Sequence, residues 1–354
     1  MNNMDDMSHM SSMSNTPGTS TGVSTLGRIT EYDLDWKSTK KGSTHELVTT
    51  RDFIFVTGQD MDKVAKLDYT GKVLAHWNMP KGSGPHGLLV DAQDRLWVSL
   101  EMAGKVVRLD DEGCIAEEVD VRIQAHGAPV PINPAPHGIC LGADKCTIWF
   151  TGKRTSTIGK INPDRTVQHF ELEQLGGVPI FLNAGPDGNV WGTELNTSMI
   201  LNVSPQGIVK EHKIPTTNSR PIAIIPDPTG DFMWFTEEAG RKVGRVDATG
   251  NIVEYPVPAL QPNHILGSLS FDSETNLWVQ VYVDSKSPVP AGPDYLVRFE
   301  KSIRQVIGTQ LSGVPYSTHV APSRGVMFHR IRMGGDGNLW FTEMMTDRIG
   351  KVTL

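Results

Sequence analysis

A β-hairpin with an aromatic residue on its second strand recurs along this chain and constrains its fold more than any other feature. The last copy reads Met333-Gly-Gly-Asp-Gly-Asn-Leu-Trp-Phe-Thr-Glu343, and two related copies end at Glu194 and Glu237. Asp-Gly between apolar residues strongly indicates a hairpin, because these residues tolerate the positive φ of tight primed turns. A hairpin repeated at a fixed period predicts a repeat architecture.

The aromatic residues of the second strands mark seven units: Phe55, Trp97, Trp149, Trp191, Trp234, Trp278 and Trp340. Successive positions are 42, 52, 42, 43, 44 and 62 residues apart, and the last interval contains an insertion. Most of these intervals match the period of roughly 40–50 residues that propeller blades have. A large residue repeated in this way is best explained as core that packs blade against blade.

The pattern predicts that the two ends of the chain share one repeat unit, as a closed ring requires. The last unit stops after its third strand, at Leu354, and the segment Gly27-Arg-Ile-Thr-Glu-Tyr-Asp-Leu34 resembles the fourth strand that begins at Gly250. A strand at about residues 26–34 would therefore complete the C-terminal blade and leave no open edge. We predict an all-β fold, a seven-bladed β-propeller of four-stranded blades spanning residues 26–354.

The amino-acid composition and charge limit the kinds of molecule that this protein is expected to bind. Residues 1–25 are rich in Met, Ser and Thr and lack the features of a signal peptide, so we expect a disordered leader. The net charge of −7 is spread along the chain, which argues against nucleic acid or an anionic membrane held by charge. No apolar run approaches the roughly 20 residues that span a bilayer. We expect a cytoplasmic monomer that acts on a small molecule.

Three long connections interrupt the repeat, at residues 122–136, 282–293 and 308–327. Connections of this length in a compact domain are often lids or binding loops, although a tolerated surface insertion is the alternative for each.

Histidine and glutamate recur at two structural positions of the repeat. In a propeller the first strand of each blade lines the central channel, and four blades carry His where this strand starts: His45, His86, His137 and His329. The corresponding residues of the fourth and fifth blades are Ile180 and Ile222. The second strands of three blades end in Glu: Glu194, Glu237 and Glu343. With the last turn centred near Asp336, residue 329 should lie opposite residue 343, within side-chain reach.

These positions predict a site at one mouth of the channel. A single His there is best read as a satisfied hydrogen-bonding residue, but four of the 11 His at one structural position favour a shared role. Imidazoles suit transition metals and carboxylates suit Mg or Ca, so one reading is a divalent-metal site. The other is a general acid/base pair of His and Glu.

The repeats of the form Pro136-His-Gly-Ile139, Asp336-Gly-Asn-Leu-Trp-Phe-Thr-Glu343 and Arg348-Ile-Gly-Lys-Val352 resemble those of the virginiamycin B lyase (streptogramin lyase) family, over nearly all of residues 26–354. The resemblance implies a seven-bladed propeller that opens the ester linkage of a cyclic streptogramin B antibiotic by elimination. It also implies a divalent metal cofactor, typically Mg. His329 and Glu343 match the family's catalytic His and the Glu 14 residues beyond it, whereas Met327 stands where the family has a second Glu.

The predicted site residues follow from the pattern and the resemblance together. The catalytic candidates are His329, Glu343, His86 and His137. The metal-binding candidates are His45, Glu194 and Glu237. The substrate-binding candidates are His264, Arg220, His319 and Arg324, with His264 the nearest match to the His expected at the start of the sixth blade.

Other functions remain open at this point. The histidines could hold a redox metal such as the four-His iron of carotenoid-cleaving propellers, or shape a cyclisation pocket with no metal. The chain could also be a non-catalytic binding platform, because the Trp-Phe-Thr-Glu repeat is informative about fold more than about chemistry.

Overall fold

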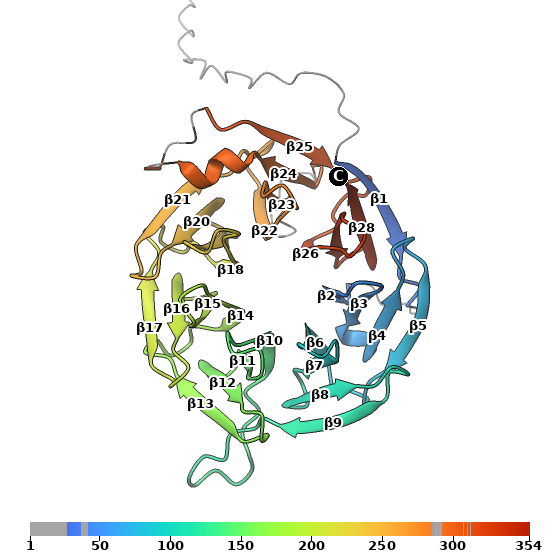
Figure 1. Ribbon diagram of the computed structural model, residues 1–354, viewed down its shortest axis with the longest axis vertical. Helices are drawn as coiled ribbons and strands as arrows, with labels where there is room; N and C mark the ends of the chain where they lie inside the picture. The colour runs from blue at the N-terminus through green and yellow to red at the C-terminus, as the bar shows by residue number, and fades with distance from the viewer. Residues whose placement is uncertain are drawn as a thin grey trace, which may run out of the picture.

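The computed structural model describes residues 27–36, 42–284, 286, 292–306, 308–309, 311 and 313–354. These residues build a ring of seven antiparallel four-stranded sheets around a common axis (Figure 1). The predicted seven-bladed propeller is therefore confirmed. The predicted leader, residues 1–25, lies outside the described residues.

Within each of the first six blades the strands pair in chain order. Blades one to three comprise β2 (Thr44–Thr49), β3 (Ile54–Gly58), β4 (Lys63–Leu67) and β5 (Val73–Asn78); β6 (Pro85–Val90), β7 (Leu96–Leu100), β8 (Lys105–Leu109) and β9 (Ile115–Asp120); and β10 (Pro136–Leu141), β11 (Ile148–Gly152), β12 (Thr157–Ile161) and β13 (Val167–Glu171). Blades four to six comprise β14 (Pro179–Ala184), β15 (Val190–Glu194), β16 (Met199–Val203) and β17 (Val209–Lys213); β18 (Pro221–Pro226), β19 (Met233–Glu237), β20 (Lys242–Val246) and β21 (Ile252–Pro256); and β22 (His264–Phe271), β23 (Leu277–Val283), β24 (Tyr295–Phe299) and β25 (Tyr316–Val320). Two short 3₁₀ helices, η1 (Gln59–Met61) and η2 (Lys301–Gln305), complete the described elements.

Blade seven joins the two ends of the chain. It comprises β26 (Phe328–Met333), β27 (Leu339–Glu343), β28 (Arg348–Thr353) and, on its outer edge, β1 (Arg28–Asp33). Strand β1 pairs antiparallel with β28 over its whole length, from Arg28 opposite Thr353 to Asp33 opposite Arg348. The predicted ring closure is therefore confirmed, because β1 covers the edge of β28 as the fourth strand of this blade.

The repeated aromatic residues form the core between blades, as expected. Trp97, Trp191, Trp234, Trp278 and Trp340 are at most 1% exposed. The indole N–H of Trp340 donates to the carboxylate of Asp336 at 3.1 Å, and Trp97 makes the same contact with Asp91 at 2.9 Å. The Asp of the hairpin turn thus also satisfies the one polar atom of the buried ring.

The long connections differ from the expected binding loops. The connection from β9 to β10 projects from the outer edge of the ring, away from the channel (Figure 1). The segment 308–327 contains β25, the outermost strand of blade six, rather than a loop alone. Of the connection 282–293, the structure describes only residues 282–284, 286 and 292–293. Among the described residues, no helix has the length and apolar character needed to cross a bilayer.

Candidate active site

Four imidazoles meet at one mouth of the channel. They belong to His45 on β2, His86 on β6, His137 on β10 and His329 on β26. The ring centres of His45 and His329 are 5.2 Å apart, those of His45 and His86 are 5.1 Å apart, and those of His86 and His137 are 3.6 Å apart. The predicted gathering of the four histidines is therefore observed in the structure.

A β-bulge at the start of each inner strand directs these side chains. Phe328 pairs with Glu343 and Ile331 with Phe341, so two residues, His329 and Arg330, face a single residue of β27. The same shift follows Thr44, Pro85 and Pro136 in blades one to three. The extra residue re-aims the chain toward the channel. The predicted contact between His329 and Glu343 is wrong, because counting from the turn assumes a regular ladder.

A hydroxyl on the second strand fixes each bulge, a role that the sequence interpretation missed. Oγ1 of Thr342 accepts a hydrogen bond from the backbone N–H of Arg330 at 3.0 Å and donates to the carbonyl of His45 at 2.7 Å. Thr57 and Ser99 make the same pair of bonds, reaching the carbonyls of His86 and His137 at 2.9 and 3.0 Å. The hydroxyl residue at this position of the second strand, Thr342, Thr57 or Ser99, therefore holds the histidine backbone of the next blade.

The Pro-His-Gly repeat has a steric cause. A Cβ atom on Gly87 would lie 2.3 Å from the carbonyl oxygen of His137, and one on Gly138 would lie 2.5 Å from that of Ile180. Neighbouring blades approach so closely here that only glycine fits beside the histidine.

Backbone carbonyls fix the tautomers of two histidines. Nδ1 of His45 lies 2.7 Å from the carbonyl of Ser43, and Nδ1 of His137 lies 2.9 Å from that of Ile180. A carbonyl only accepts, so Nδ1 carries the proton and Nε2 keeps its lone pair. Burial lowers the pKa of His45 to about 4, with help from His329, and burial holds the pKa values of His86 and His137 well below their usual range. These three imidazoles are neutral near pH 7.

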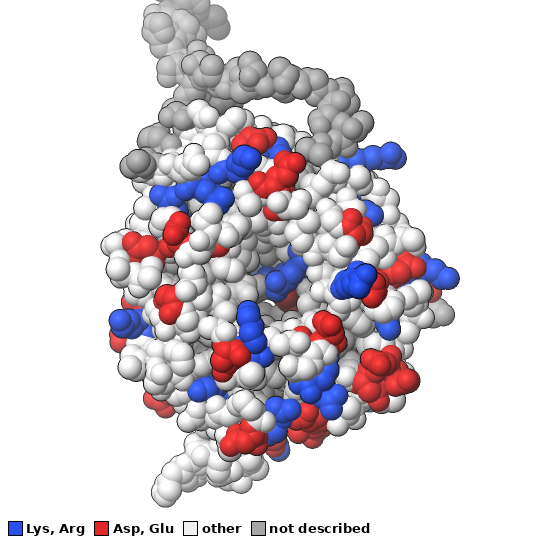
Figure 2. Space-filling model, viewed as in Figure 1, with Lys and Arg blue, Asp and Glu red and all other residues white. Residues whose placement is uncertain are grey.

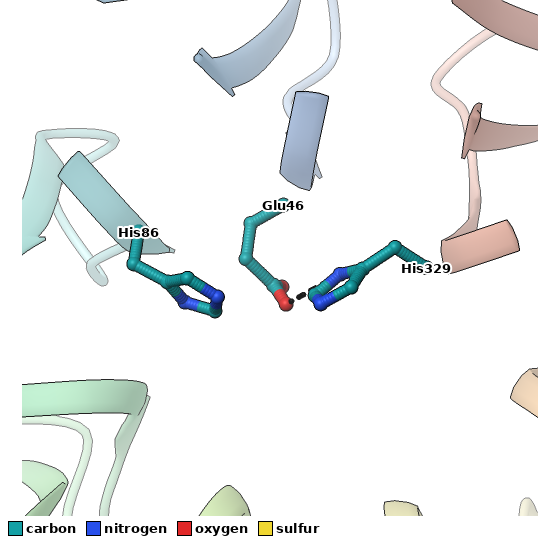
Figure 3. Close-up of side chains that lie close together, drawn as sticks. All are labelled: Glu46, His86 and His329. Atoms are coloured by element: carbon teal, nitrogen blue, oxygen red, sulfur yellow. Dashed lines mark ion pairs between the residues drawn. The ribbon is translucent and has the colours of Figure 1, made fainter. Parts of the chain in front are cut away.

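Glu46 is the central carboxylate of the site, and the sequence interpretation did not select it. Its carboxylate lies between the rings of His86 and His329 (Figure 3). Nδ1 of His329 is 3.3 Å from Oε1 of Glu46, and the guanidinium of Arg330 binds both carboxylate oxygens. Burial opposes ionisation, but Arg330 outweighs it and holds the pKa of Glu46 well below its usual range. The only signal in the sequence that could have identified Glu46 is its position next to His45.

A second carboxylate, Glu101, lies beside the other end of the histidine row. Oε1 is 3.1 Å from the ammonium of Lys153, and Oε2 accepts a hydrogen bond from the side-chain amide of Gln59 at 2.8 Å. Glu101 follows the last residue of β7 and is 4% exposed.

A cavity of about 210 Å³ adjoins the histidines on the side of blades four and five. Its apolar wall includes Ile180, Phe181, Ile222 and Met327, and His137, His329 and Arg330 border it. At its rim Arg220 forms an ion pair with Glu238 at 2.6 Å, and Glu238 accepts a hydrogen bond from the hydroxyl of Tyr282 at 2.9 Å. Figure 2 shows the ring hollowed at its centre, with Lys or Arg atoms lining part of the hollow. Arg220, one of the predicted substrate-binding residues, therefore lines this cavity.

The three predicted strand-end glutamates lie apart from the histidines. Glu194 and Glu343 accept hydrogen bonds from the hydroxyls of Thr197 and Thr346, at 2.6 and 2.7 Å, three residues further along their own chain segments. Burial raises the pKa of Glu194 to about 7, of Glu237 to about 9 and of Glu343 to about 8. Among the described residues, no group of potential metal ligands includes any of the three. The expectation that they face the histidines is wrong, because the bulge moves the histidines out of register.

Three other predicted substrate-binding residues lie away from the cavity. His264 bonds within blade six, to the carbonyl of Pro293 at 3.1 Å and to the hydroxyl of Tyr295 at 3.3 Å. Gly267, not His264, follows the last regular pair before the bulge of β22. His319 lies on the outermost strand β25 against Trp278, and Arg324 is exposed in the segment before β26. Only the assignment of His264 rested on alignment with the other blades, and the insertion in blade six displaced that alignment.

Among the described residues, two groups of side chains could hold a metal ion: Glu46, His86 and His329, and His86, Glu101 and His137. In each group the ligand atoms lie within 4.8 Å of one another. Nδ1 of His86, the residue common to both, is buried without a hydrogen-bond partner among the described residues. Imidazole nitrogens with one carboxylate match the donors that transition ions prefer, more closely than the oxygen ligands that Mg prefers.

Fold and site together define a seven-bladed propeller in which a cluster of histidines and glutamates on the inner strands adjoins a cavity. The sequence profile of the virginiamycin B lyase family matches residues 118–286. A virginiamycin B lyase of Nocardia farcinica (strain IFM 10152) is 30% identical over an alignment that covers 49% of this chain and 70% of that protein. The chain belongs to the virginiamycin B lyase family.

Solved structures support the same fold. A streptogramin B lyase superposes with a TM-score of 0.76 at 23% identity, covering 93% of this chain and 98% of that chain. A catalytically inactive variant of the Staphylococcus aureus virginiamycin B lyase with quinupristin superposes with a TM-score of 0.73 at 24% identity, covering 92% and 99%.

Proposed function

We propose that this protein is a carbon–oxygen lyase that opens an ester bond in a cyclic, streptogramin-like small molecule by elimination. Family membership and the names of the relatives support the reaction class. The observation that carries the proposal is the pairing of His329 with Glu46 at the edge of the cavity, with 3.3 Å between Nδ1 and Oε1. It replaces the expected pair of His329 and Glu343.

His329 is the proposed general base. A carboxylate beside Nδ1 favours the tautomer with the proton on that nitrogen, which leaves the Nε2 lone pair to accept a proton from substrate. The proton leaves the carbon next to a carbonyl group, and its electron pair forms a double bond to the neighbouring carbon. The carbon–oxygen bond there breaks, and the former ester leaves as a carboxylate. Glu46 stabilises the imidazolium that forms and is itself held ionised by Arg330.

The cavity would bind and orient the substrate. Its apolar wall on blades four and five suits the hydrophobic side chains of a cyclic depsipeptide, and burial of such groups is the main source of binding energy. Lys153 and Arg220 line the same cavity and place positive charge where a departing carboxylate would accumulate.

The family resemblance implies a divalent ion, and the residues present fit one. His86 would hold it together with either Glu46 and His329 or Glu101 and His137, and its buried, unpartnered Nδ1 is the observation in favour. Such an ion would polarise the substrate carbonyl and stabilise the enolate-like charge.

The test is turnover of quinupristin, followed by mass spectrometry and ultraviolet absorption. Elimination gives a linear product of unchanged mass with a new carbon–carbon double bond, whereas hydrolysis adds one water. His329→Ala should lower kcat/KM by about 10²–10⁴-fold, the usual contribution of a general base. His126→Ala removes an exposed imidazole from the loop between β9 and β10 and serves as the matched control. A hydrolytic product, or full activity of His329→Ala, would refute the proposal.

A further inference from the structure

We infer that His86, His137 and Glu101, at the junction of blades two and three, form the metal site of this protein and that it takes a first-row transition ion. The inference deepens the proposed function, because it separates the metal ligands from the pair of His329 and Glu46 that moves the proton. His86 and His137 start the neighbouring inner strands β6 and β10, and Glu101 follows β7, so one blade junction supplies all three ligands.

The two imidazoles are already arranged as ligands. Nδ1 of His137 donates to the carbonyl of Ile180 at 2.9 Å, which leaves Nε2 unprotonated. A ligating histidine in a metal protein almost always donates its other nitrogen in this way, since the bond fixes the ring orientation and raises the basicity of the ligand. His86 is 1% exposed, and its Nδ1 has no hydrogen-bond partner in the described part of the chain. A buried polar atom without a partner is costly unless something binds it.

Two neighbours outside the group bind the carboxylate of Glu101. The side-chain amide of Gln59 donates to Oε2 at 2.8 Å, and the ammonium of Lys153 lies 3.1 Å from Oε1. The Lys153 side chain is 36% exposed and has a flexible stem, so its ammonium can move into solvent when another cation approaches Glu101. Lys153 is therefore a competing cation at this position.

The alternative group lacks that freedom. Glu46 is bound through both oxygens by Arg330, whose side chain is 5% exposed, and Arg330 also lies 3.8 Å from the ring centre of Phe181 across the channel. A guanidinium cannot lose its charge and is enclosed here, so an ion at Glu46 would face a fixed positive neighbour. The observed charges thus favour Glu101 over Glu46 as the carboxylate ligand.

The size of the group suits a small ion. Its ligand atoms lie within 4.8 Å of one another. Ligands about 2.0–2.2 Å from a tetrahedral ion are roughly 3.4 Å apart, so the ligand atoms would have to close by at most about 1.4 Å to complete the site. Two nitrogens and one carboxylate oxygen are the donors of zinc and iron enzymes, whereas Mg prefers oxygen throughout.

The experiment is titration of the full, chelator-treated chain with Co²⁺, Zn²⁺ and Mg²⁺ by calorimetry, with the visible absorption of Co²⁺ as a second readout. We expect Co²⁺ and Zn²⁺ to bind more tightly than Mg²⁺. His137→Ala and Glu101→Gln should each weaken Co²⁺ binding at least about tenfold and change its spectrum. Lys153→Met should strengthen binding about tenfold, because it removes a competing charge beside Glu101.

His329→Ala is the matched comparison, since it removes an imidazole from the same mouth but from the alternative group. It should leave the affinity for Co²⁺ unchanged. Gln59→Leu keeps all three ligands and should weaken binding through the orientation of Glu101 alone. Melting curves of each variant report folding separately.

Unchanged Co²⁺ affinity in both His137→Ala and Glu101→Gln, or a loss in His329→Ala as large as theirs, would overturn the inference. The titrations use no substrate, so this failure is separate from that of the proposed function. If quinupristin is not eliminated while Co²⁺ binds as expected, the metal site stands and the proposed reaction fails.

Discussion

Two halves of the channel mouth are built from the same repeat and differ in chemistry. The histidine arc, formed by His329, His45, His86 and His137 on blades seven, one, two and three, carries imidazoles at the bulge. The apolar arc, formed by Ile180 and Ile222 on blades four and five, carries aliphatic side chains at the same position. One half therefore offers ligands and bases, and the other offers a surface for hydrophobic groups.

The two arcs also differ in how firmly their backbones are held. In the histidine arc the hydroxyls of Thr342, Thr57 and Ser99 donate to the next histidine carbonyl at 2.7–3.0 Å. In the apolar arc the bond from Thr193 to the carbonyl of Ile222 is 3.3 Å long, and the hydroxyl of Thr236 has no partner among the described residues. Catalytic groups need fixed positions more than a hydrophobic wall does. The shorter hydrogen bonds to the backbone therefore occur in the arc that carries the proposed catalytic groups.

The largest expected effect is at the ion pair that anchors the histidine arc. Arg330→Met leaves Glu46 buried and without its cation, which should lower the free energy of unfolding by about 3–5 kcal/mol. The measurement is urea denaturation at pH 7. Adding Glu46→Leu to this variant should restore much of the stability, because a buried ion pair can be replaced by apolar residues at little cost. A double variant no more stable than Arg330→Met would show that the charge pair is not the cause.

The next effect is a pH dependence of stability that has opposite signs for the buried strand-end glutamates and for His45. Burial raises the pKa of Glu237 to about 9 and that of Glu343 to about 8, against 4.5 in an unfolded chain. Between pH 4.5 and the raised pKa, the folded protein therefore keeps a proton on each carboxyl group that the unfolded chain has lost. Stability is then lost as the pH rises, by about 1.4 kcal/mol per pH unit for each group. His45, with its pKa lowered to about 4 from 6.5, has the opposite sign and loses stability as the pH falls below 6.5.

Because the contribution of His45 changes only below pH 6.5, urea denaturation between pH 6.5 and 8 measures the change in unfolding free energy that the glutamates cause. Glu343 is buried near Glu31, Arg348 and Thr346, and Glu343→Gln keeps its shape without the ionisation. We expect this variant to lose less stability over that range than the wild-type chain, by about 2 kcal/mol. Parallel curves for the two proteins would mean that Glu343 is already ionised at pH 6.5.

The fold was predictable because it depends on local chemistry that repeats. The amino-acid sequence alone shows the Asp-Gly turns and an aromatic residue every 40–50 residues. It also shows the match between residues 27–34 and the strand at Gly250. The same pattern correctly grouped the four histidines, because that prediction required only the blade and the strand end of each residue and not the exact pairing register. Errors within blade six, at His264 and His319, arose where the insertion broke the repeat.

The contacts inside the site were not predictable to the same degree. A bulge adds one residue to one strand and has no characteristic amino-acid composition that would reveal it in the sequence. The predicted register, which paired His329 with Glu343, was therefore wrong by one residue. Glu46 was overlooked because it follows a histidine on a strand and alternation would direct it away from the channel. Only the three-dimensional bulge brings residues 45 and 46 to the same mouth.

The difference in backbone bonding between the arcs has its own test, with a matched pair of threonines. Thr342→Val leaves the N–H of Arg330 and the carbonyl of His45 without their partner and should cost about 1–3 kcal/mol in unfolding free energy. Thr236→Val is the same substitution at the same place in blade five, where the hydroxyl bonds to no described residue, and should be neutral or slightly stabilising. Equal effects of the two variants would remove the distinction in rigidity that we draw.

The smallest effect concerns the apolar arc as a binding wall. Ile222 contributes side-chain surface to the cavity, and its backbone carbonyl, not its side chain, accepts the bond from Thr193. Ile222→Ala should therefore raise the KM for quinupristin about tenfold with kcat nearly unchanged, because the contact is made equally in the ground and transition states. Leu175→Ala removes an exposed aliphatic side chain outside the cavity and is the control. If kcat falls instead while KM stays constant, the apolar arc takes part in the transition state. The division of the mouth into a chemical half and a binding half would then be wrong.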